Sequence, residues 1–231
     1  MADFWERKIR ARQERVEPRL WMSRDQEVRH PEIHSEPHLD TEAMARPDPQ
    51  SETLRLASMV EGSIVDGPGM RFVVFAQGCP HRCVGCHNPQ THLSVGGRAV
   101  TVEQVLAAYD RQTACRGVTL SGGEPFMQAG LFARVADAVH QRGGDVITYT
   151  GYRLESLRER SRTESGVRDL LDKTDLLIDG PFVLAKRCLE LPFVGSLNQR
   201  LISLSMAGDQ LLEDIPTLKS CPAIERVPAS D

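Results

Sequence analysis

The sequence predicts an α/β fold in which parallel strands form a partial, open barrel with helices between them. From about residue 52 onward, apolar strand-like segments alternate with amphipathic helical segments, an order typical of parallel β/α units. Polar or glycine-rich segments follow the strands, at the ends where such folds place ligand sites. The units are too few for a complete eight-stranded barrel, so we expect the barrel to stay open.

The strand predictions rest on short apolar runs bounded by glycine, proline and polar residues. Segments 54–60 and 63–65 are predicted as two short strands around Gly62. Segment 71–76 (RFVVFA) is predicted as a strand that runs directly into a group of cysteines. Further strands are expected at 117–120, 145–150, 175–178 and 200–204.

The helix predictions rest on apolar spacing and on signals at the helix ends. Segment 101–111 is expected to be helical because Thr101 and Gln104 are placed for a capping box. Segment 129–142 has an apolar side and ends at two glycines, which favour helix termination. A further helix is expected near 154–160.

We divide the chain of 231 residues into three regions. Residues 1–50 are rich in Arg, Glu, His and Pro and poor in aliphatic residues, so we expect a flexible, disordered N-terminal extension. Residues 51–205 are expected to form the partial barrel. Residues 206–231 are predicted as a C-terminal tail, and we assign no role to either terminal region.

Composition and charge exclude several classes of protein. The formal net charge is −4, whereas nucleic-acid-binding domains usually have a basic face. There is no apolar run long enough to span a bilayer. The charged N-terminus lacks the apolar core of a signal peptide. We therefore expect a cytoplasmic protein with reduced cysteines that binds neither nucleic acid nor membrane.

Three of the six cysteines lie close together. Cys79, Cys83 and Cys86 form the pattern C-x3-C-x2-C. Three thiolates can hold three irons of a [4Fe–4S] cluster, which leaves a fourth iron open to an exogenous ligand. The alternative is a zinc site completed by His81 or His87, although C-x3-C is an unusual half-site for zinc.

The other cysteines are scattered along the chain. Cys115 and Cys188 are predicted as small core residues rather than metal ligands. Cys221 receives no prediction.

A second polar segment, SGGEP (121–125), closes the strand that follows the cysteines. Gly122 and Gly123 would let a ligand approach the backbone closely. The carboxylate of Glu124 could accept hydrogen bonds from an ammonium group. Each signal is weak alone, but together with the cysteine loop one strand earlier they indicate a single ligand site.

Together, C-x3-C-x2-C after one strand and GGEP after the next resemble the radical S-adenosylmethionine superfamily. This resemblance implies that the partial barrel is of the radical S-adenosylmethionine type. It implies that Cys79, Cys83 and Cys86 hold a [4Fe–4S] cluster whose open iron chelates the amino and carboxylate groups of S-adenosylmethionine. It also implies that the methionine amino group contacts the segment formed by Gly122, Gly123 and Glu124.

Further cofactor contacts are expected from the same resemblance. The superfamily often has an aromatic residue before the last cysteine, but Gly85 stands here, so an adenine contact must come from the backbone or from His87. His87 and Asn88 either contact S-adenosylmethionine or support the loop. Thr150 and Asp179 end strands on the ligand side and are expected to contact ribose or methionine.

The residues around Arg200 allow two interpretations. Asn198, Gln199 and Arg200 either contribute to the ligand site, or Arg200 pairs with a structural carboxylate.

Longer motifs narrow the resemblance. The segments 66–71 (DGPGMR), 78–89 (GCPHRCVGCHNP), 150–152 (TGY) and 195–200 (GSLNQR) are similar to those of activating proteins of anaerobic ribonucleoside-triphosphate reductases. The first two motifs are shared with pyruvate formate-lyase activating enzymes, and the last two favour the reductase activators. The similarity spans roughly residues 54–205.

The resemblance implies a mechanism for an oxidoreductase that activates a glycyl radical enzyme. A one-electron donor such as flavodoxin reduces the cluster, and S-adenosylmethionine is cleaved to methionine and a 5′-deoxyadenosyl radical. That radical removes hydrogen from a backbone glycine of the reductase. No catalytic acid–base side chain is required. The alternatives are an activase of another glycyl radical enzyme such as pyruvate formate-lyase, a peptide-modifying radical enzyme, or a zinc-binding interaction module.

Overall fold

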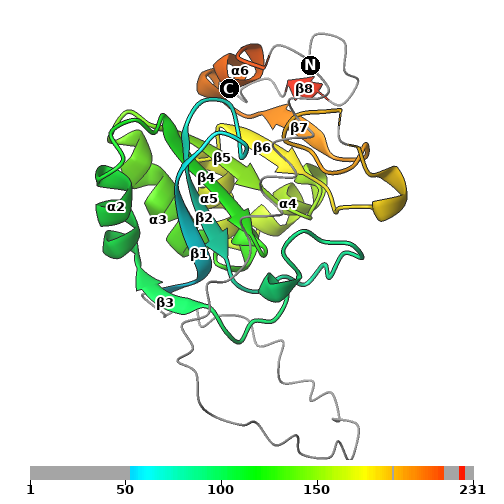
Figure 1. The fold of residues 1–231 in the computed structure, drawn as a ribbon, viewed down its shortest axis with the longest axis horizontal. Coiled ribbons are helices and arrows are strands. Elements are labelled where there is room, and N and C mark those ends of the chain that lie inside the picture. Colours follow the sequence, from blue (N-terminus) through cyan, green and yellow to red (C-terminus); the bar gives the residue numbers. More distant parts are fainter. Residues whose placement is uncertain (1–52, 189, 216–223, 227–231) are drawn as a thin grey trace, which may run out of the picture. The chain divides into compact units, whose positions relative to one another are not determined.

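The computed structural model describes residues 53–188, 190–215 and 224–226. Their strands form one sheet in the order β3-β1-β2-β4-β5-β6-β7-β8 (Figure 1). Four central strands pair in parallel: β2 (Arg71–Ala76), β4 (Gly117–Gly122), β5 (Asp145–Tyr149) and β6 (Leu176–Asp179). The predicted α/β class with an open sheet of parallel strands is confirmed in this central part.

The outer strands make the sheet mixed rather than wholly parallel. On one side, β1 (Thr53–Ser63) pairs antiparallel with both β2 and β3 (Arg98–Thr101). On the other side, β7 (Arg200–Ser203) pairs antiparallel with β6, and β8 (Ile224–Arg226) is parallel to β7. The strand predicted at 200–204 is present, but the expectation that it extends the parallel sheet is wrong.

The connection between β6 and β7 explains the reversal of β7. Its described part contains only a short 3-10 helix, η4 (Leu184–Lys186). Parallel neighbours need a long crossover, usually an α-helix, whereas antiparallel neighbours do not. Strand β7 therefore returns beside β6 in the opposite direction.

Strand β1 is continuous, so the prediction of two short strands around Gly62 is wrong. Its pairing with β2 is irregular between Leu56 and Ser58 and again between Val60 and Ser63. Gly62 lies in the second irregular stretch with a φ of 77°, a conformation that glycine adopts without strain. An irregularity of this kind bends a strand without ending it.

The predicted helices appear as α2 (Val102–Asp110), α3 (Ala129–His140) and α4 (Leu154–Ser161). The capping box of α2 is confirmed: the Gln104 N–H donates to Thr101 Oγ1 at 3.2 Å, and the Thr101 N–H donates to Gln104 Oε1 at 2.9 Å. Sequence reasoning missed β3, α5 (Ser165–Asp172) and α6 (Met206–Glu213).

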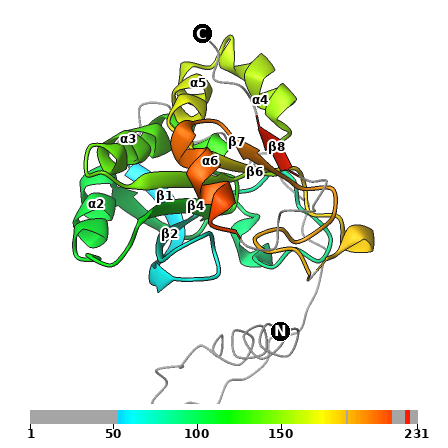
Figure 2. The same ribbon diagram turned by 90° about the horizontal axis from the view of Figure 1, so that it is seen from above.

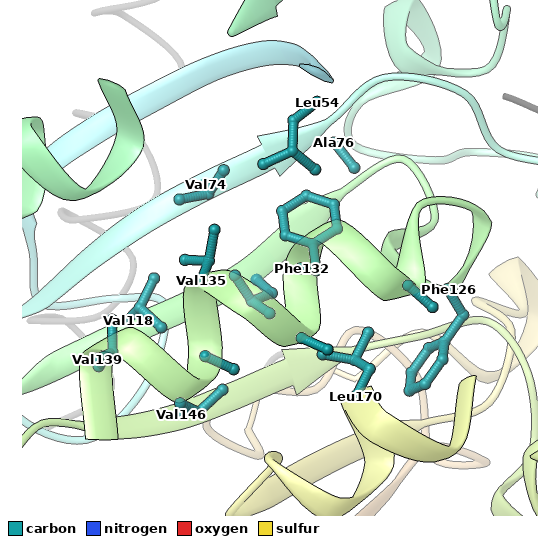
Figure 3. Packing of buried hydrophobic residues seen from close by; sticks show 14 of the residues in the cluster. Leu54, Val74, Ala76, Val118, Phe126, Phe132, Val135, Val139, Val146 and Leu170 are labelled. Atoms are coloured by element: carbon teal, nitrogen blue, oxygen red, sulfur yellow. The ribbon is translucent and has the colours of Figure 1, made fainter. Parts of the chain in front are cut away.

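The main hydrophobic core lies between the sheet and the helices α2 to α5. Figure 3 shows Phe132 and Val135 of α3 directed toward strand residues such as Val74. Alternate residues along β2 join this core, as expected where side chains alternate between the two faces of a sheet. The parallel strands are thus fixed from one face by tightly packed helices.

A second core lies on the opposite face of the sheet. Ile147, Ile178 and Leu201 pack there with Leu211 and Leu212 of α6. Figure 2 shows α6 lying along β6 and β7. The predicted tail, 206–231, therefore begins with a helix that packs on the sheet.

The flexible extension predicted for residues 1–50 lies outside the described residues, and so does Cys221. Among the described residues, no helix combines the length and apolar character needed to cross a membrane.

Candidate functional site

The turns that follow the parallel strands meet at the carboxyl edge of the sheet. The cysteine loop follows β2, SGGEP begins in the last residues of β4, and the turn 150–152 follows β5. The Glu124 N–H donates to the Gly78 carbonyl at 2.8 Å. The Gly180 N–H, after β6, donates to the Tyr152 carbonyl at 2.9 Å. The segments singled out in the sequence therefore lie together.

The cysteine loop is closed at its base by backbone and side-chain hydrogen bonds. The Gly78 N–H donates to the Thr91 carbonyl at 2.9 Å, and the Cys79 N–H donates to the His92 carbonyl at 3.1 Å. The side-chain amide of Gln77 donates to two more carbonyls of the loop at 3.1 and 2.7 Å. Gln77 is buried, and sequence reasoning missed it. The signal was a polar residue directly after an apolar strand.

Within the loop the backbone follows an irregular course. Gly78 and Gly85 have φ values of 94° and 76°, and Arg82 has a φ of 44°, in the left-handed region that disfavours residues other than glycine. A Cβ on Gly85 would lie 3.0 Å from Leu184 Cδ1. Gly78 and Gly85 adopt these conformations without strain and so allow the irregular course.

The thiols of Cys79, Cys83 and Cys86 are free and half-buried. Burial raises the pKa of the Cys79 thiol to about 11, and hydrogen bonds from the backbone of His81 and Arg82 oppose that rise. A metal must therefore displace a proton to bind this sulfur. N–H groups directed at sulfur are also the donors that cluster-bound thiolates accept, so the loop suits thiolate ligation.

The residues after the last cysteine contact the loop itself. Burial raises the pKa of the Cys86 thiol, and the Asn88 N–H donates to Cys86 Sγ at 3.4 Å. The Asn88 carbonyl accepts from Thr91 Oγ1 at 2.7 Å. The His87 ring lies 5.9 Å from the Phe182 ring, centroid to centroid. These contacts favour the supporting role for Asn88, and a ligand contact by either residue stays a prediction.

The described part of the chain holds no preformed site for a single metal ion, since no three His, Cys, Asp or Glu side chains there converge on one point.

Glu124 lies wholly buried behind the cysteine loop, with 0% exposure. Its Oε1 accepts from the Phe126 N–H and from Thr150 Oγ1, both at 3.0 Å. Its Oε2 accepts from the Gly151 N–H at 2.9 Å and again from Thr150 Oγ1 at 3.0 Å. The turn after β5 thus fixes the carboxylate that follows β4.

His81 brings the cysteine loop to the same carboxylate. Its Nε2 lies 2.9 Å from Glu124 Oε2. Its ring meets the Tyr152 ring edge-to-face, with centroids 4.5 Å apart. Sequence reasoning considered His81 only as a zinc ligand and missed this contact, because the partners are separated by 43 positions.

Gly122 and Gly123 are required by the packing of the chain on itself. A Cβ on Gly122 would lie 2.6 Å from the Ala76 nitrogen, and one on Gly123 would lie 2.3 Å from the Gly78 carbonyl oxygen. Side chains there would push β4 away from the cysteine loop. The prediction that these glycines also admit a ligand remains untested.

Both carboxylate oxygens of Asp179 accept hydrogen bonds from the protein. Its carboxylate accepts from Arg200 Nε at 2.9 Å and from the Leu154 N–H at 2.8 Å, at the start of α4. Arg200 also pairs with Glu155 at 3.0 Å. Of the two interpretations of Arg200, pairing with a structural carboxylate is confirmed. Ligand contacts of Asp179 and Thr150 remain predictions.

The turn after β6 is held by the motif that precedes β7. Asn198 Nδ2 donates to the Pro181 carbonyl at 2.8 Å, and Gln199 Nε2 donates to the Gly180 carbonyl at 3.1 Å.

Cys115 packs against the main core as predicted. The core role expected for half-buried Cys188 stays a prediction.

Comparisons with known proteins agree with this arrangement. Residues 65–202 match the family described as "4Fe-4S single cluster domain". The anaerobic ribonucleoside-triphosphate reductase-activating protein of Vibrio cholerae is 33% identical over 146 residues, which is 59% of this chain and 89% of that protein. Its counterpart in Escherichia coli K12 is 30% identical over 144 residues, covering 59% and 90%.

More distant similarities also occur. The pyruvate formate-lyase-activating enzyme of Clostridium pasteurianum is 38% identical over 96 residues, 38% of this chain and 40% of that enzyme. Among solved structures, QueE from Escherichia coli aligns with a TM-score of 0.38 and 21% identity, over 43% of this chain and 52% of QueE. That structural likeness is too weak to bear on the fold. The sequence left two kinds of metal site open, an iron–sulfur cluster and a zinc site. The family match favours the iron–sulfur cluster.

Proposed function

This chain belongs to the 4Fe-4S single cluster domain family and to the anaerobic ribonucleoside-triphosphate reductase-activating proteins, and from that premise we propose that it generates a glycyl radical on such a reductase. It is an enzyme of the radical S-adenosylmethionine type that uses a [4Fe–4S] cluster and S-adenosylmethionine. In our proposal Cys79, Cys83 and Cys86 would hold the cluster at the edge of the sheet that also bears Glu124.

One observation supports the proposed site above all others. The Glu124 N–H donates to the carbonyl of Gly78 at 2.8 Å, and Gly78 directly precedes the first cysteine of the loop. The carboxylate and the thiols are therefore held at one edge of the sheet by a direct backbone contact. A ligand that binds the open iron through an amino acid group would find a buried carboxylate beside it.

The cluster and S-adenosylmethionine, when bound, supply a one-electron cleavage that yields a radical able to remove hydrogen from a glycine backbone. The protein's own residues orient the ligand and exclude water. Glu124 accepts hydrogen bonds from the ligand's ammonium group, and Thr150 and Gly151 hold that carboxylate in place. Gly122 and Gly123 keep β4 close to the loop.

We assign supporting or ligand-contacting roles to five further residues of this edge. Gly85, His87 and Asn88 border the last cysteine and are proposed to contact the ligand or shape the loop. Thr150 also positions Glu124, and Asp179 also holds Arg200 and the start of α4. Direct contacts of Thr150 and Asp179 with ribose or methionine are part of the proposal.

The partners follow from the proposed chemistry. The protein receiving the radical is an anaerobic ribonucleoside-triphosphate reductase, and the electron comes from a one-electron donor such as flavodoxin. A cytoplasmic location is part of the proposal, because a reducing compartment keeps the three thiols available for iron.

The target is tested by electron paramagnetic resonance. The protein, loaded anaerobically with iron and sulfide, is mixed with reductant, S-adenosylmethionine and purified anaerobic reductase. A glycyl radical signal is expected with the reductase and not with a reductase whose radical glycine is replaced by alanine. A Cys83→Ala variant of the activase serves as the matched control and should give no signal.

A second candidate target is pyruvate formate-lyase. It is favoured by the 38% identity shared with the formate-lyase activating enzyme over 96 residues. The same mixture with a formate-lyase in place of the reductase separates the two. A glycyl radical with the formate-lyase alone would reverse our assignment of the target.

A further inference from the structure

We propose that His81 occupies, in the ligand-free protein, the place on Glu124 that the ammonium group of S-adenosylmethionine takes when it binds. The inference rests on the proposed function, because it presumes that Glu124 receives this ammonium group. It adds that the His81 side chain must move away from Glu124 before the ligand's ammonium group can bind to that carboxylate.

The first argument is the number of hydrogen bonds that Glu124 accepts. An ionised carboxylate offers about four acceptor positions. The donors to Glu124 are the Phe126 N–H, Thr150 Oγ1, the Gly151 N–H and His81 Nε2, at 2.9–3.0 Å. With all of them in place, a further donor can bind only where one of them withdraws.

The second argument concerns which donor can withdraw. The Phe126 N–H belongs to η3 (Pro125–Met127), directly after Glu124. The Gly151 N–H and Thr150 Oγ1 follow β5, and Thr150 Oγ1 also accepts from the Tyr152 N–H at 3.1 Å. The two N–H groups can withdraw only if the backbone moves, and the Thr150 hydroxyl is held a second time by the Tyr152 N–H. His81 alone among these four donors comes from the cysteine loop, so its side chain can move by rotation.

The third argument is the position of the imidazole. The His81 side chain is 17% exposed, whereas that of Glu124 is 0% exposed. The ring lies directly on Gly151, where a Cβ would approach His81 Cδ2 to 2.3 Å. It also packs edge-to-face on Tyr152. His81 therefore covers the side of the carboxylate that faces the loop, and a side chain at position 151 would collide with the ring.

The chemistry of the two donors favours the exchange. An ammonium group carries a positive charge and three N–H donors, so it adds an ion pair to the hydrogen bond that it makes with the carboxylate. The other donors to Glu124 are backbone amides and a hydroxyl, which bring no positive charge. A ligand with an amino group can thus replace the imidazole, and one without an amino group cannot.

The test is equilibrium binding to the full chain, loaded anaerobically with its cluster. Two ligands are compared: S-adenosylmethionine, and 5′-methylthioadenosine, which lacks the amino acid part. His81→Ala and His81→Leu remove the donor, and leucine keeps an apolar group against Tyr152. Both variants should bind S-adenosylmethionine about fivefold more tightly, because no hydrogen bond has to be broken first. His81→Gln keeps a donor and should bind like the wild type.

The control ligand makes the result specific. The affinity for 5′-methylthioadenosine should be unchanged in all variants, since this ligand does not reach Glu124. A second outcome is that the wild type binds S-adenosylmethionine while both His81→Ala and His81→Leu bind it equally well or more weakly. That result would overturn the exchange of His81 for the ammonium group and leave the proposed function standing. An equal change for both ligands would also overturn it. No binding of S-adenosylmethionine even by the loaded wild type would overturn the proposed function itself.

Discussion

Two buried carboxylates lie at opposite edges of the parallel sheet, and their surroundings differ in charge. At the amino edge, Asp145 begins β5 and pairs with the guanidinium groups of Arg71 and Arg116. At the carboxyl edge, Glu124 is held by backbone amides, a hydroxyl and the imidazole of His81. Guanidinium groups stay charged in proteins. Asp145 is therefore permanently neutralised, whereas Glu124 can still pair with a cation.

The amino edge is held by an extended network of hydrogen bonds and ion pairs. Arg71 is 0% exposed and donates to the Val118 carbonyl at 2.7 Å, to Thr119 Oγ1 at 3.2 Å and to the Asp145 carbonyl at 3.1 Å. Asp145 and Arg116 extend the network to Asp214 beyond α6. We infer that this edge stabilises the fold and that the opposite edge serves the ligand.

The largest expected effect is the loss of the cluster when a cysteine at the carboxyl edge is replaced. Cys83→Ala removes one of three proposed iron ligands, so the loaded protein should lose its cluster and its ability to cleave S-adenosylmethionine entirely. Iron and sulfide content and the product 5′-deoxyadenosine are measured together. Cys115→Ala, at a cysteine packed on the main core, is the matched control and should keep both. Full cleavage by the Cys83 variant would show that this cysteine is not a ligand.

The second largest effect is expected from a substitution that breaks the ion pair at the amino edge. Asp145→Asn leaves the buried guanidinium of Arg71 without its charged partner, and breaking a buried pair in this way costs about 3–5 kcal/mol. Glu124→Gln, the matched change at the other edge, loses hydrogen-bond acceptors to neutral groups and should cost about 1–2 kcal/mol. Denaturant unfolding of the two variants measures both. Equal losses of unfolding free energy would remove the distinction between the edges.

A smaller effect is expected at a site that belongs to neither edge. Thr101→Ala removes the cap of α2 and should lower the free energy of unfolding by about 1 kcal/mol. Binding of S-adenosylmethionine should not change, because α2 contributes no residue to the proposed site. A change in ligand affinity with this variant would show that ligand binding responds to general loss of stability, and the comparison of the edges would lose its meaning.

The smallest expected effect is a pH dependence of stability at the amino edge, which distinguishes a histidine that titrates from guanidinium groups that stay charged. There, His140 pairs with Asp175 at 2.9 Å. The hydrogen bond to Asp175 raises the pKa of His140 above its usual value, against the opposing effect of burial. Although burial opposes ionisation of Asp175, hydrogen bonds from His140, Ser205 and Val146 keep its pKa below the usual value.

The pH dependence follows from the direction of these shifts. Because the pKa of His140 is raised on folding, its contribution is fully present below pH about 6.5 and is lost as the pH rises through the folded value. The difference in unfolding free energy between wild type and His140→Gln should therefore shrink as the pH rises from 6 toward 9, in rough terms. The Asp145→Asn difference should stay constant over that range, since guanidinium groups do not titrate there. A His140 difference that grows with pH would contradict the assignment.

The sequence predicted the central strands and the turns after them because these depend on local patterns. The segment RFVVFA and the capping box at Thr101 can each be interpreted within a few residues. The antiparallel direction of β7 was not predictable in this way, because it depends on a connection whose path is set by tertiary packing. Helix α5 was missed because Gly166 lies within it; there, a Cβ would come within 2.9 Å of the Gly130 nitrogen on α3.

The candidate site was predictable to a similar degree. The cysteine pattern and GGEP identified the two turns, and the parallel order of the strands brings them together. The sequence did not predict that Thr150, Gly151 and His81 share the carboxylate of Glu124, because they lie 26, 27 and 43 positions from it in the chain. It also did not show that Arg200 pairs with Asp179. The motif around Arg200 is compatible both with a ligand contact and with a structural ion pair.

The central claim is that the carboxyl edge holds a cluster that cleaves S-adenosylmethionine, and one measurement tests it most directly. The protein is loaded anaerobically with iron and sulfide, reduced with dithionite and given S-adenosylmethionine, and 5′-deoxyadenosine is measured. Our account predicts 5′-deoxyadenosine and methionine in equal amounts, dependent on the reductant and absent with Cys83→Ala. A protein with an intact, reduced cluster that forms no 5′-deoxyadenosine would contradict it.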